Sequence, residues 1–369
     1  VFVLLDGIIF VLLTATGLRK IIFDAIPHVV KAAIPAGIGL FIAFLGLQDA
    51  KLVIPSESTG VTLASFNLLG GAGWGAVMPL IVAVFSLLLI AVLSHKKVKG
   101  SILWGILGGT GLYYILGFTV KDFYKGFAET LSFNPFKPFS AFASEAFGKV
   151  FTEGFDFSAY LSADGHSVGG LVILFITTAL AFCMVDMFDT LGTLYGACRG
   201  GNLLVKNDKG ELEVPNMDRA MMADAVATCT GSVLGTSTVT TFVESSAGVA
   251  AGGKTGVTSL VTAAAFAVAL FFAPIAKLIP PYAYGAALIY VGVLMIGSVK
   301  DIDWKDVSVS VPAFLTIAMM PFTYNISYGI AFGLFSYVII KAFCGEIKQI
   351  KIGTWVVTAL FVAMFFLTH

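Results

Sequence analysis

The chain has 369 residues, of which 58% are hydrophobic and only 12% are charged, and its formal net charge at pH 7 is zero. A soluble globular domain carries about twice that charged fraction, so the composition argues against a soluble protein. Because the net charge is zero, the chain has no excess positive charge of the kind that binds nucleic acid, and no nucleic-acid partner is expected.

Apolar runs recur along the whole chain, many of them long enough to cross a bilayer, which takes about 17–25 residues. The candidate spans cover residues 1–17, 30–48, 76–94, 101–118, 171–195, 220–235, 256–277, 282–299, 308–320, 325–343 and 352–368. The last of these could be either a span or an interfacial helix. The sequence therefore predicts an all-α polytopic membrane protein in contact with the lipid bilayer.

Positive charge predicts the orientation of these spans. Lys and Arg cluster in four connecting segments, and alternate counting of the spans puts all four on one side, the cytoplasm. The segments carry Arg19, Lys20 and Lys31; residues 95–99; Arg199, Lys206, Lys209 and Arg219; and Lys300 and Lys305. The Phe-rich segment 119–170 then lies outside, and its composition favours an amphipathic cap on the membrane face.

A weak internal repeat is visible in the pattern. Residues 18–22 and Pro27 lead into the glycine-bearing span 35–46, and residues 275–280 lead into a similar span at 285–297. The two spans cross in opposite directions, which is typical of the inverted-topology repeats of secondary transporters. Because partners of the elements at 171–252 would precede Val1, we expect the sequence to be N-terminally incomplete.

Two aspartates lie inside the span 171–195. A carboxylate at membrane depth costs about 2.5–3.5 kcal/mol, so it persists only if it is paired, protonated or hydrated. Asp186 and Asp189 are three residues apart and share a helical face, which Thr190 and Thr193 extend. The alternative is a helix end that dips into the lipid headgroups.

Residues 236–252 differ from the other apolar segments. The first part is β-branched and favours an extended strand, and the second part is small and compatible with a helix. Glu244, Ser245 and Ser246 stand where the helix would begin. A strand followed by a half-helix within a bundle is typical of a discontinuous span. A polar loop outside the membrane is the alternative.

Together, the acids Asp186, Asp189 and Glu244 suit a proton-coupled carrier of a small substrate rich in N–H groups. Burial and a like-charged neighbour favour the neutral form of a carboxyl, so one of the acids could carry the coupling proton. Phe242 could stack on a flat base, or simply pack. Asp224, at shallower depth, is expected to have a structural role. The four cysteines and four histidines form no metal or catalytic pattern, and no cofactor is expected.

The chain resembles the nucleobase–ascorbate transporter family, also called nucleobase–cation symporter family two, in its AzgA-like purine permease branch. The resemblance covers nearly the whole chain. The motifs that carry it are Gly37–Gln48, Val185–Thr193, Gly235–Ser245 and Gly329–Gly333.

The resemblance implies a fourteen-helix, 7+7 inverted-repeat fold with a core and a gate domain, of which three spans would precede Val1. The implied parts are a core span at 1–20, gate spans at 21–118, an extracellular loop at 119–170, core spans with the substrate site at 171–277, gate spans at 278–343 and a C-terminal segment at 344–369. A homodimer through the gate domain is one arrangement that it allows.

The implied activity is import of adenine, guanine or hypoxanthine by proton symport across the plasma membrane. By position, Asp189 and Glu244 match substrate-binding acids, Asp186 matches a further required acid, and Phe242 falls at an aromatic position. We expect Thr193 and Ser245 to join the substrate site, and Thr190 and Thr241 to support it and the proton-coupling acid.

Two other functions stay open. A carrier of uracil, xanthine or another small substrate could use the same fold. A membrane-embedded aspartyl hydrolase is a more remote alternative, because Asp186 and Asp189 lie on one helix and such enzymes face their aspartates from two. The sequence also lacks a Ser–His or HExxH pattern.

Overall fold

The computed structural model describes residues 1–68, 70–121, 123–124, 140, 142–161, 168–206, 212–242, 244–272, 276 and 278–368. This part of the chain is mostly α-helical. Four helical segments in it are long and apolar enough to cross a membrane, namely His28–Asp49, Trp74–His95, Pro281–Lys300 and Ile326–Phe343. A fifth results if the bent pair α1–α2 counts as one span. The predicted helical membrane class is therefore confirmed, whereas the inverted repeat stays a prediction.

Most helices coincide with the predicted spans. They are α1 (Phe2–Ala15), α2 (Leu18–Ala25), α3 (His28–Asp49), α4 (Trp74–His95), α5 (Ser101–Gly117), α8 (Lys149–Thr152), α9 (Ser158–Leu161), α10 (Val168–Gly200), α11 (Met217–Val233), α12 (Ser245–Ala250), α13 (Gly256–Phe271), α15 (Pro281–Met295), α16 (Val307–Thr323), α17 (Ile326–Phe343) and α18 (Ile352–Thr368). Shorter π or 3-10 turns are η1 (Phe142–Ala146), η2 (Ile296–Asp301) and η3 (Ile347–Gln349). Two small antiparallel hairpins pair β1 (Val53–Ser56) with β2 (Gly60–Leu63) and β3 (Val205–Lys206) with β4 (Leu212–Glu213).

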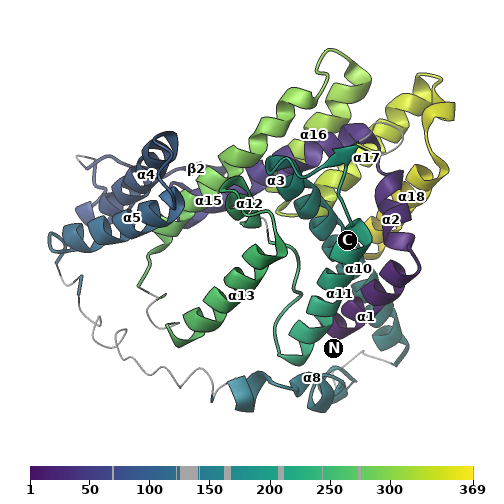
Figure 1. The fold of residues 1–369 in the computed structure, drawn as a ribbon, viewed down its shortest axis with the longest axis horizontal. Coiled ribbons are helices and arrows are strands. Elements are labelled where there is room, and N and C mark those ends of the chain that lie inside the picture. Colours follow the sequence, from purple (N-terminus) through teal and green to yellow (C-terminus); the bar gives the residue numbers. More distant parts are fainter. Residues whose placement is uncertain are drawn as a thin grey trace. The chain divides into compact units, whose positions relative to one another are not determined.

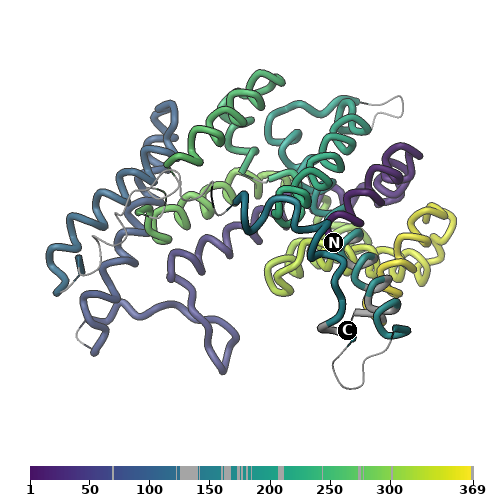
Figure 2. The backbone as a smooth tube through the Cα atoms, turned by 90° about the horizontal axis from the view of Figure 1, so that it is seen from below, coloured from purple at the N-terminus to yellow at the C-terminus, as the bar shows by residue number. Residues whose placement is uncertain are grey.

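The chain divides into two compact units, each assembled from separate stretches of sequence. Unit 1 comprises Val1–Ile38, Ala141–Ser245 and Met295–His369, and unit 2 comprises Gly39–Ser140 and Ser246–Leu294. The tube in Figure 2 shows the purple, teal and yellow stretches that make up unit 1. The expected division into core and gate ranges stays a prediction.

In unit 1, α1 packs against α2, α10 and α11 (Figure 1), and α10 also packs against α17 and α18. Helices α16 and α17 form a tight hairpin that Asn325 caps, since its Oδ1 accepts hydrogen bonds from the backbone N–H groups of Ser327 and Tyr328 at 2.9 and 3.3 Å. The other end of α16 is capped by Asp306, which accepts from the N–H of Ser308 at 2.8 Å. This bond holds the pKa of the Asp306 carboxyl below its usual value.

A sharp bend separates α1 from α2. The two helix axes differ by 83°, and Gly17 at the bend has a φ of +74°. Glycine adopts this left-handed conformation without the steric cost that a side chain adds. The sequence pattern predicted a loop after residue 17, but residues 18–25 form α2, which carries Arg19 into the interior of unit 1.

In unit 2, α3 and α15 approach closely through glycines. A Cβ on Gly285 would lie 2.7 Å from the carbonyl oxygen of Gly46, and a Cβ on Gly292 would lie 2.4 Å from the carbonyl oxygen of Gly39. Small residues at such crossings allow helix backbones to pack directly, which is how helices associate where lipid removes the hydrophobic driving force.

Two predicted segments are only partly described. In the expected extracellular loop 119–170, residues 122, 125–139, 141 and 162–167 lie outside the described residues. The rest forms turns, short helices and the start of α10, with exposed rings such as Phe147, Phe151 and Phe155. Residues 236–242 form no paired strand with any described segment. The segment is not helical, and its backbone bonds to side chains, as when Thr228 donates to the Val239 carbonyl at 3.0 Å. The expected short strand stays a prediction, since the partner expected for it would precede Val1.

The close crossing of α3 and α15 predicts that Gly285→Ala destabilises the protein. The added methyl group meets backbone atoms that cannot move aside, and overpacking of this kind costs about 1–3 kcal/mol. Thermal unfolding of the detergent-purified protein should show a lower transition temperature. Gly111→Ala is the matched control, because a Cβ there meets nothing within 4 Å and alanine favours a helix interior. Equal transition temperatures for the two variants would contradict the close approach.

Candidate functional site

Unit 1 contains a group of charged side chains far from solvent. Asp6 on α1, Arg19 on α2, Asp186 on α10 and Asp224 on α11 are all buried, with at most 7% of each residue exposed. Burying a charge is costly unless it is paired or neutralised. The contacts of these four side chains therefore define what the interior of unit 1 can do.

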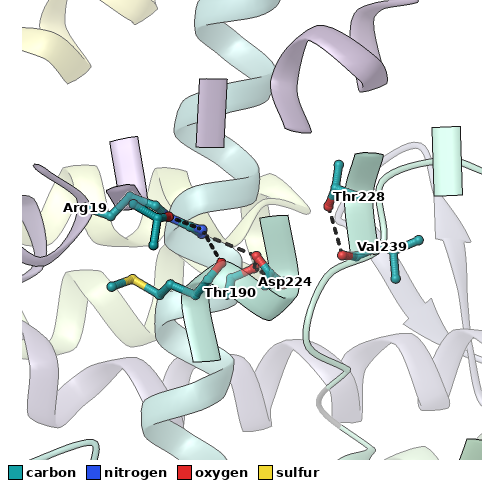
Figure 3. Close-up of polar contacts among 7 residues, drawn as sticks. Arg19, Thr190, Asp224, Thr228 and Val239 are labelled. Carbon is teal, nitrogen blue, oxygen red and sulfur yellow. Dashed lines mark hydrogen bonds and ion pairs between the residues drawn. The ribbon is translucent and has the colours of Figure 1, made fainter. Parts of the chain in front are cut away.

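Arg19 and Asp224 form a buried ion pair. The Nη2 atom of Arg19 lies 3.3 Å from Oδ2 of Asp224, and its Nη1 donates to the carbonyl oxygen of Met221 at 3.1 Å and to the hydroxyl of Thr14 at 3.5 Å. Figure 3 shows Arg19 reaching toward Asp224 beside α10. The guanidinium also stacks on the ring of Phe10, with Cζ 4.3 Å from the centroid. The pair therefore joins α1, α2 and α11.

Asp224 is the acceptor at the centre of a wider network. The hydroxyl of Thr190 lies 3.1 Å from both of its oxygens, and the backbone of Thr241 interacts with it electrostatically. The side chain of Asp224 is buried within unit 1, whereas its depth in the membrane stays a prediction. Of the two threonines expected to support the site, Thr190 bonds to Asp224 and Thr241 acts on it electrostatically.

The positive-charge count included Arg19 as a loop residue. Because Arg19 is fully buried and paired, it does not belong with the exposed charges of a cytoplasmic loop. Lys20 on the same helix is exposed, so the orientation argument for this segment depends on Lys20 and Lys31.

Asp6 and Asp186 form a second acidic pair beside the first. They lie on helices that pack against each other, and their carboxyl groups interact electrostatically. No other described group donates to any of their four oxygens. Gly7, next to Asp6, has no side chain between the two helices. A Cβ there would lie 2.7 Å from Sγ of Cys229 and 2.9 Å from its backbone nitrogen. Helix α1 therefore packs directly on α11 at this level.

The predicted substrate acids lie further along the same unit. Asp189 is half-buried on α10 and accepts a hydrogen bond from Thr193 at 3.5 Å. Glu244 is exposed, and its charge acts on Asp189. The structure thus brings the two predicted substrate acids into electrostatic range of each other.

Other predicted site residues surround the start of α12. Phe242 is 63% exposed, and Ser245 is the exposed first residue of a helix only six residues long. Val243 lies outside the described residues. Among the described residues, no group of three or more His, Cys, Asp or Glu side chains is arranged to hold a metal ion.

Sequence reasoning missed the roles of Asp6 and Arg19. Asp6 is a lone acid in the apolar run that begins at Val1, and an ionisable residue within a span is by default a candidate functional residue. For Arg19 the available signal was Gly17, which can end one helix and begin another at an angle. Neither signal identifies the partner, because Asp186 and Asp224 are distant in sequence.

Comparison with known proteins identifies the kind of molecule that carries this arrangement. The model of a permease family matches residues 1–332. The chain belongs to the nucleobase–ascorbate transporter family. The predicted resemblance is thereby confirmed.

Similar proteins match along nearly the whole chain. A protein of Methanocaldococcus jannaschii that is named as a permease is 38% identical over 98% of this chain and 74% of its own length. The guanine/hypoxanthine permease PbuO of Bacillus subtilis is 37% identical over 98% of this chain and 76% of its own. The adenine permease AdeQ of Escherichia coli is 32% identical over 95% and 70%, respectively.

Removal of the Arg19 charge should destabilise the transporter. Arg19→Met keeps the apolar stem but leaves Asp224 buried without its cation, which costs about 3–5 kcal/mol. The expected result is a clearly lower transition temperature in detergent. Adding Asp224→Asn should restore part of the loss, because the remaining buried charge is then removed.

Lys149→Met is the matched control for this prediction. Lys149 pairs with Glu153 on the surface, and exposed ion pairs contribute little to stability. A loss of stability equal to that of Arg19→Met would show that the burial of the Arg19–Asp224 pair is not what matters.

Proposed function

We propose that this protein is a secondary active transporter that imports purine nucleobases together with protons across the cell membrane. The observation that carries the proposal is the placement of Asp189 and Glu244 within electrostatic range of each other in unit 1. Relatives that match nearly the whole chain are named as guanine/hypoxanthine and adenine permeases, which favours a purine as the substrate.

The two acids suit the chemistry of a purine. Carboxylates accept hydrogen bonds from ring and exocyclic N–H groups, and bonds to a charged acceptor are the strong ones. Thr193 donates to Oδ1 of Asp189, and the proposal assigns Oδ2 as the acceptor for a base. Glu244 supplies a second acceptor at an exposed position, and the exposed ring of Phe242 offers a face for stacking. Ser245 adds a hydroxyl beside Glu244.

A transporter of this family needs two parts that move relative to each other. We propose the core assignment for 1–20 and 171–277 and the gate assignment for 21–118 and 278–343, within a 7+7 inverted repeat. A homodimer through the gate domain belongs to the same proposal. Support comes from family membership and from the apolar helices of the chain.

Two alternatives can be tested in the same assay. A uracil or xanthine carrier would show stronger competition from those bases than from adenine, guanine or hypoxanthine. A hydrolase would require water at paired aspartates, and the oxygens of Asp186 are buried. Membership of a permease family also favours transport over hydrolysis.

Asp189→Asn and Glu244→Gln should each reduce purine uptake strongly. Each variant removes a charged acceptor, and hydrogen bonds to charged groups contribute about 1.5–3 kcal/mol, or roughly 10- to 150-fold in transport efficiency. Uptake of labelled adenine, guanine and hypoxanthine by proteoliposomes containing the full-length protein measures this. Glu57→Gln, at an exposed position in the β1–β2 turn, is the matched control. Unchanged uptake by both site variants would disprove the assignment.

Proton coupling gives a separate expectation. A protonophore that collapses an inward proton gradient should abolish accumulation of the base above its external concentration, because the gradient is then no longer available to drive import. Equilibration of the base should continue. Accumulation that is indifferent to the protonophore would point to a facilitator or to another coupling ion.

A further inference from the structure

The acidic pair of Asp6 on α1 and Asp186 on α10 is not among the residues that the proposed function assigns to binding of the base. We propose that Asp6 and Asp186 share one proton between their carboxyl groups, and that this pair takes up and releases the proton that accompanies the base. This inference rests on the proposed function, because it assigns the coupling step of the same transporter to a pair of residues separate from the acids that bind the base.

The first argument is the absence of any donor. Both carboxyl groups are buried, they interact with each other, and no other described side chain or backbone group donates to them. Two ionised carboxylates would place two negative charges near each other in a buried environment, where their repulsion is strong. A proton held between them removes one charge and supplies the missing hydrogen bond, as in other carboxyl pairs that share a site.

The second argument is the charge balance around the pair. The described charged and titratable groups that act on it are Arg19 on α2, Asp224 and Cys229 on α11, and Cys183 and Asp189 on α10. Arg19 is the only cation among them, and it is already paired with Asp224. A fully ionised pair therefore has no dedicated counter-ion, so its protonated form is favoured when the site is closed to water.

The third argument concerns release. The Nε atom of Arg19 is buried and has no acceptor, and Arg19 attracts the charge of Asp6. When the proton leaves as hydronium to the inner solution, the extra negative charge on Asp6 can be stabilised by this N–H. The base then leaves from Asp189 and Glu244, and the emptied pair is reprotonated from the outer solution. One base and one proton enter in each cycle.

The neighbouring contacts explain how protonation of the pair could affect the residues that bind the base. Asp186 and Asp189 lie one turn apart on α10, and Thr190, which follows Asp189, donates to Asp224, which pairs with Arg19. A change of charge at the pair therefore reaches Asp189 through α10, and reaches the segment that leads to Glu244 through Asp224 and Thr241. The two functions are separate in their residues but adjacent in space within unit 1.

Asp6→Asn is the decisive variant, because an asparagine amide can donate to Asp186 and so imitates the protonated pair permanently. Such a protein should fold, with a transition temperature close to that of the unmodified protein. In proteoliposomes, an inward gradient of one pH unit should drive about tenfold accumulation of the base by the unmodified protein. Asp6→Asn should show none, yet it should still exchange labelled for unlabelled base at a similar rate, since exchange needs no net proton release.

The matched control is Asp24→Asn, which removes an exposed carboxylate from α2 and should retain accumulation. Asp6→Glu keeps a titratable carboxyl and should restore part of it. Gradient-driven accumulation by Asp6→Asn would overturn the proposal. Parallel loss of stability, exchange and accumulation would also overturn it in favour of a structural role.

A second measurement separates this proposal from the proposed function. Infrared difference spectra on a pH jump should show the C=O band of a buried carboxylic acid in the unmodified protein, and that band should be lost in Asp6→Asn but retained in Asp24→Asn. If the unmodified protein fails to transport any base in the panel, the proposed function fails, and the band still decides whether the pair holds a proton. Absence of the band in the unmodified protein would refute the shared proton.

Discussion

The organisation of unit 1 depends on the cost of burying charge. Three acids and one arginine are taken out of water within the same group of helices. Removing a charge from water costs several kcal/mol even after relaxation, so each must find a partner or lose its charge. Arg19 and Asp224 solve this by pairing, with Thr190 and backbone groups satisfying the remaining bonds. Asp6 and Asp186 have no such donors, which is why their contact is informative.

The geometry that makes the ion pair depends on a single flexible position. Gly17 allows α1 to end and α2 to turn through 83°, so that Arg19 comes back toward α11. A continuous helix through this region would carry Arg19 onward along the axis of α1 instead. Close packing reinforces the arrangement, because Gly7 lets α1 approach the backbone of α11 at Cys229. Small residues therefore position the charged ones.

Much of the helical framework could be predicted from sequence, for a local reason. A span is defined by about 20 consecutive apolar residues, and the backbone must then be helical because lipid offers no other hydrogen-bonding partner. The structure of segment 236–242 was harder to predict, because an extended run forms a β-strand only when a second strand lies beside it. Asp186 and Asp189 were identified as candidate site residues because acids in an apolar helix are conspicuous, but their different surroundings were not visible.

The sequence by itself determined the class of the protein, the position of most helices and the acids that could matter, because hydropathy and helix periodicity are properties of neighbouring residues. Only the tertiary structure decided which acids meet. Asp6 finds Asp186 and Arg19 finds Asp224 across some 180 to 205 residues of chain. Such contacts depend on how α1, α2, α10 and α11 pack and bend. Hydropathy and helix periodicity describe neighbouring residues only, so they do not predict which distant residues this packing brings together.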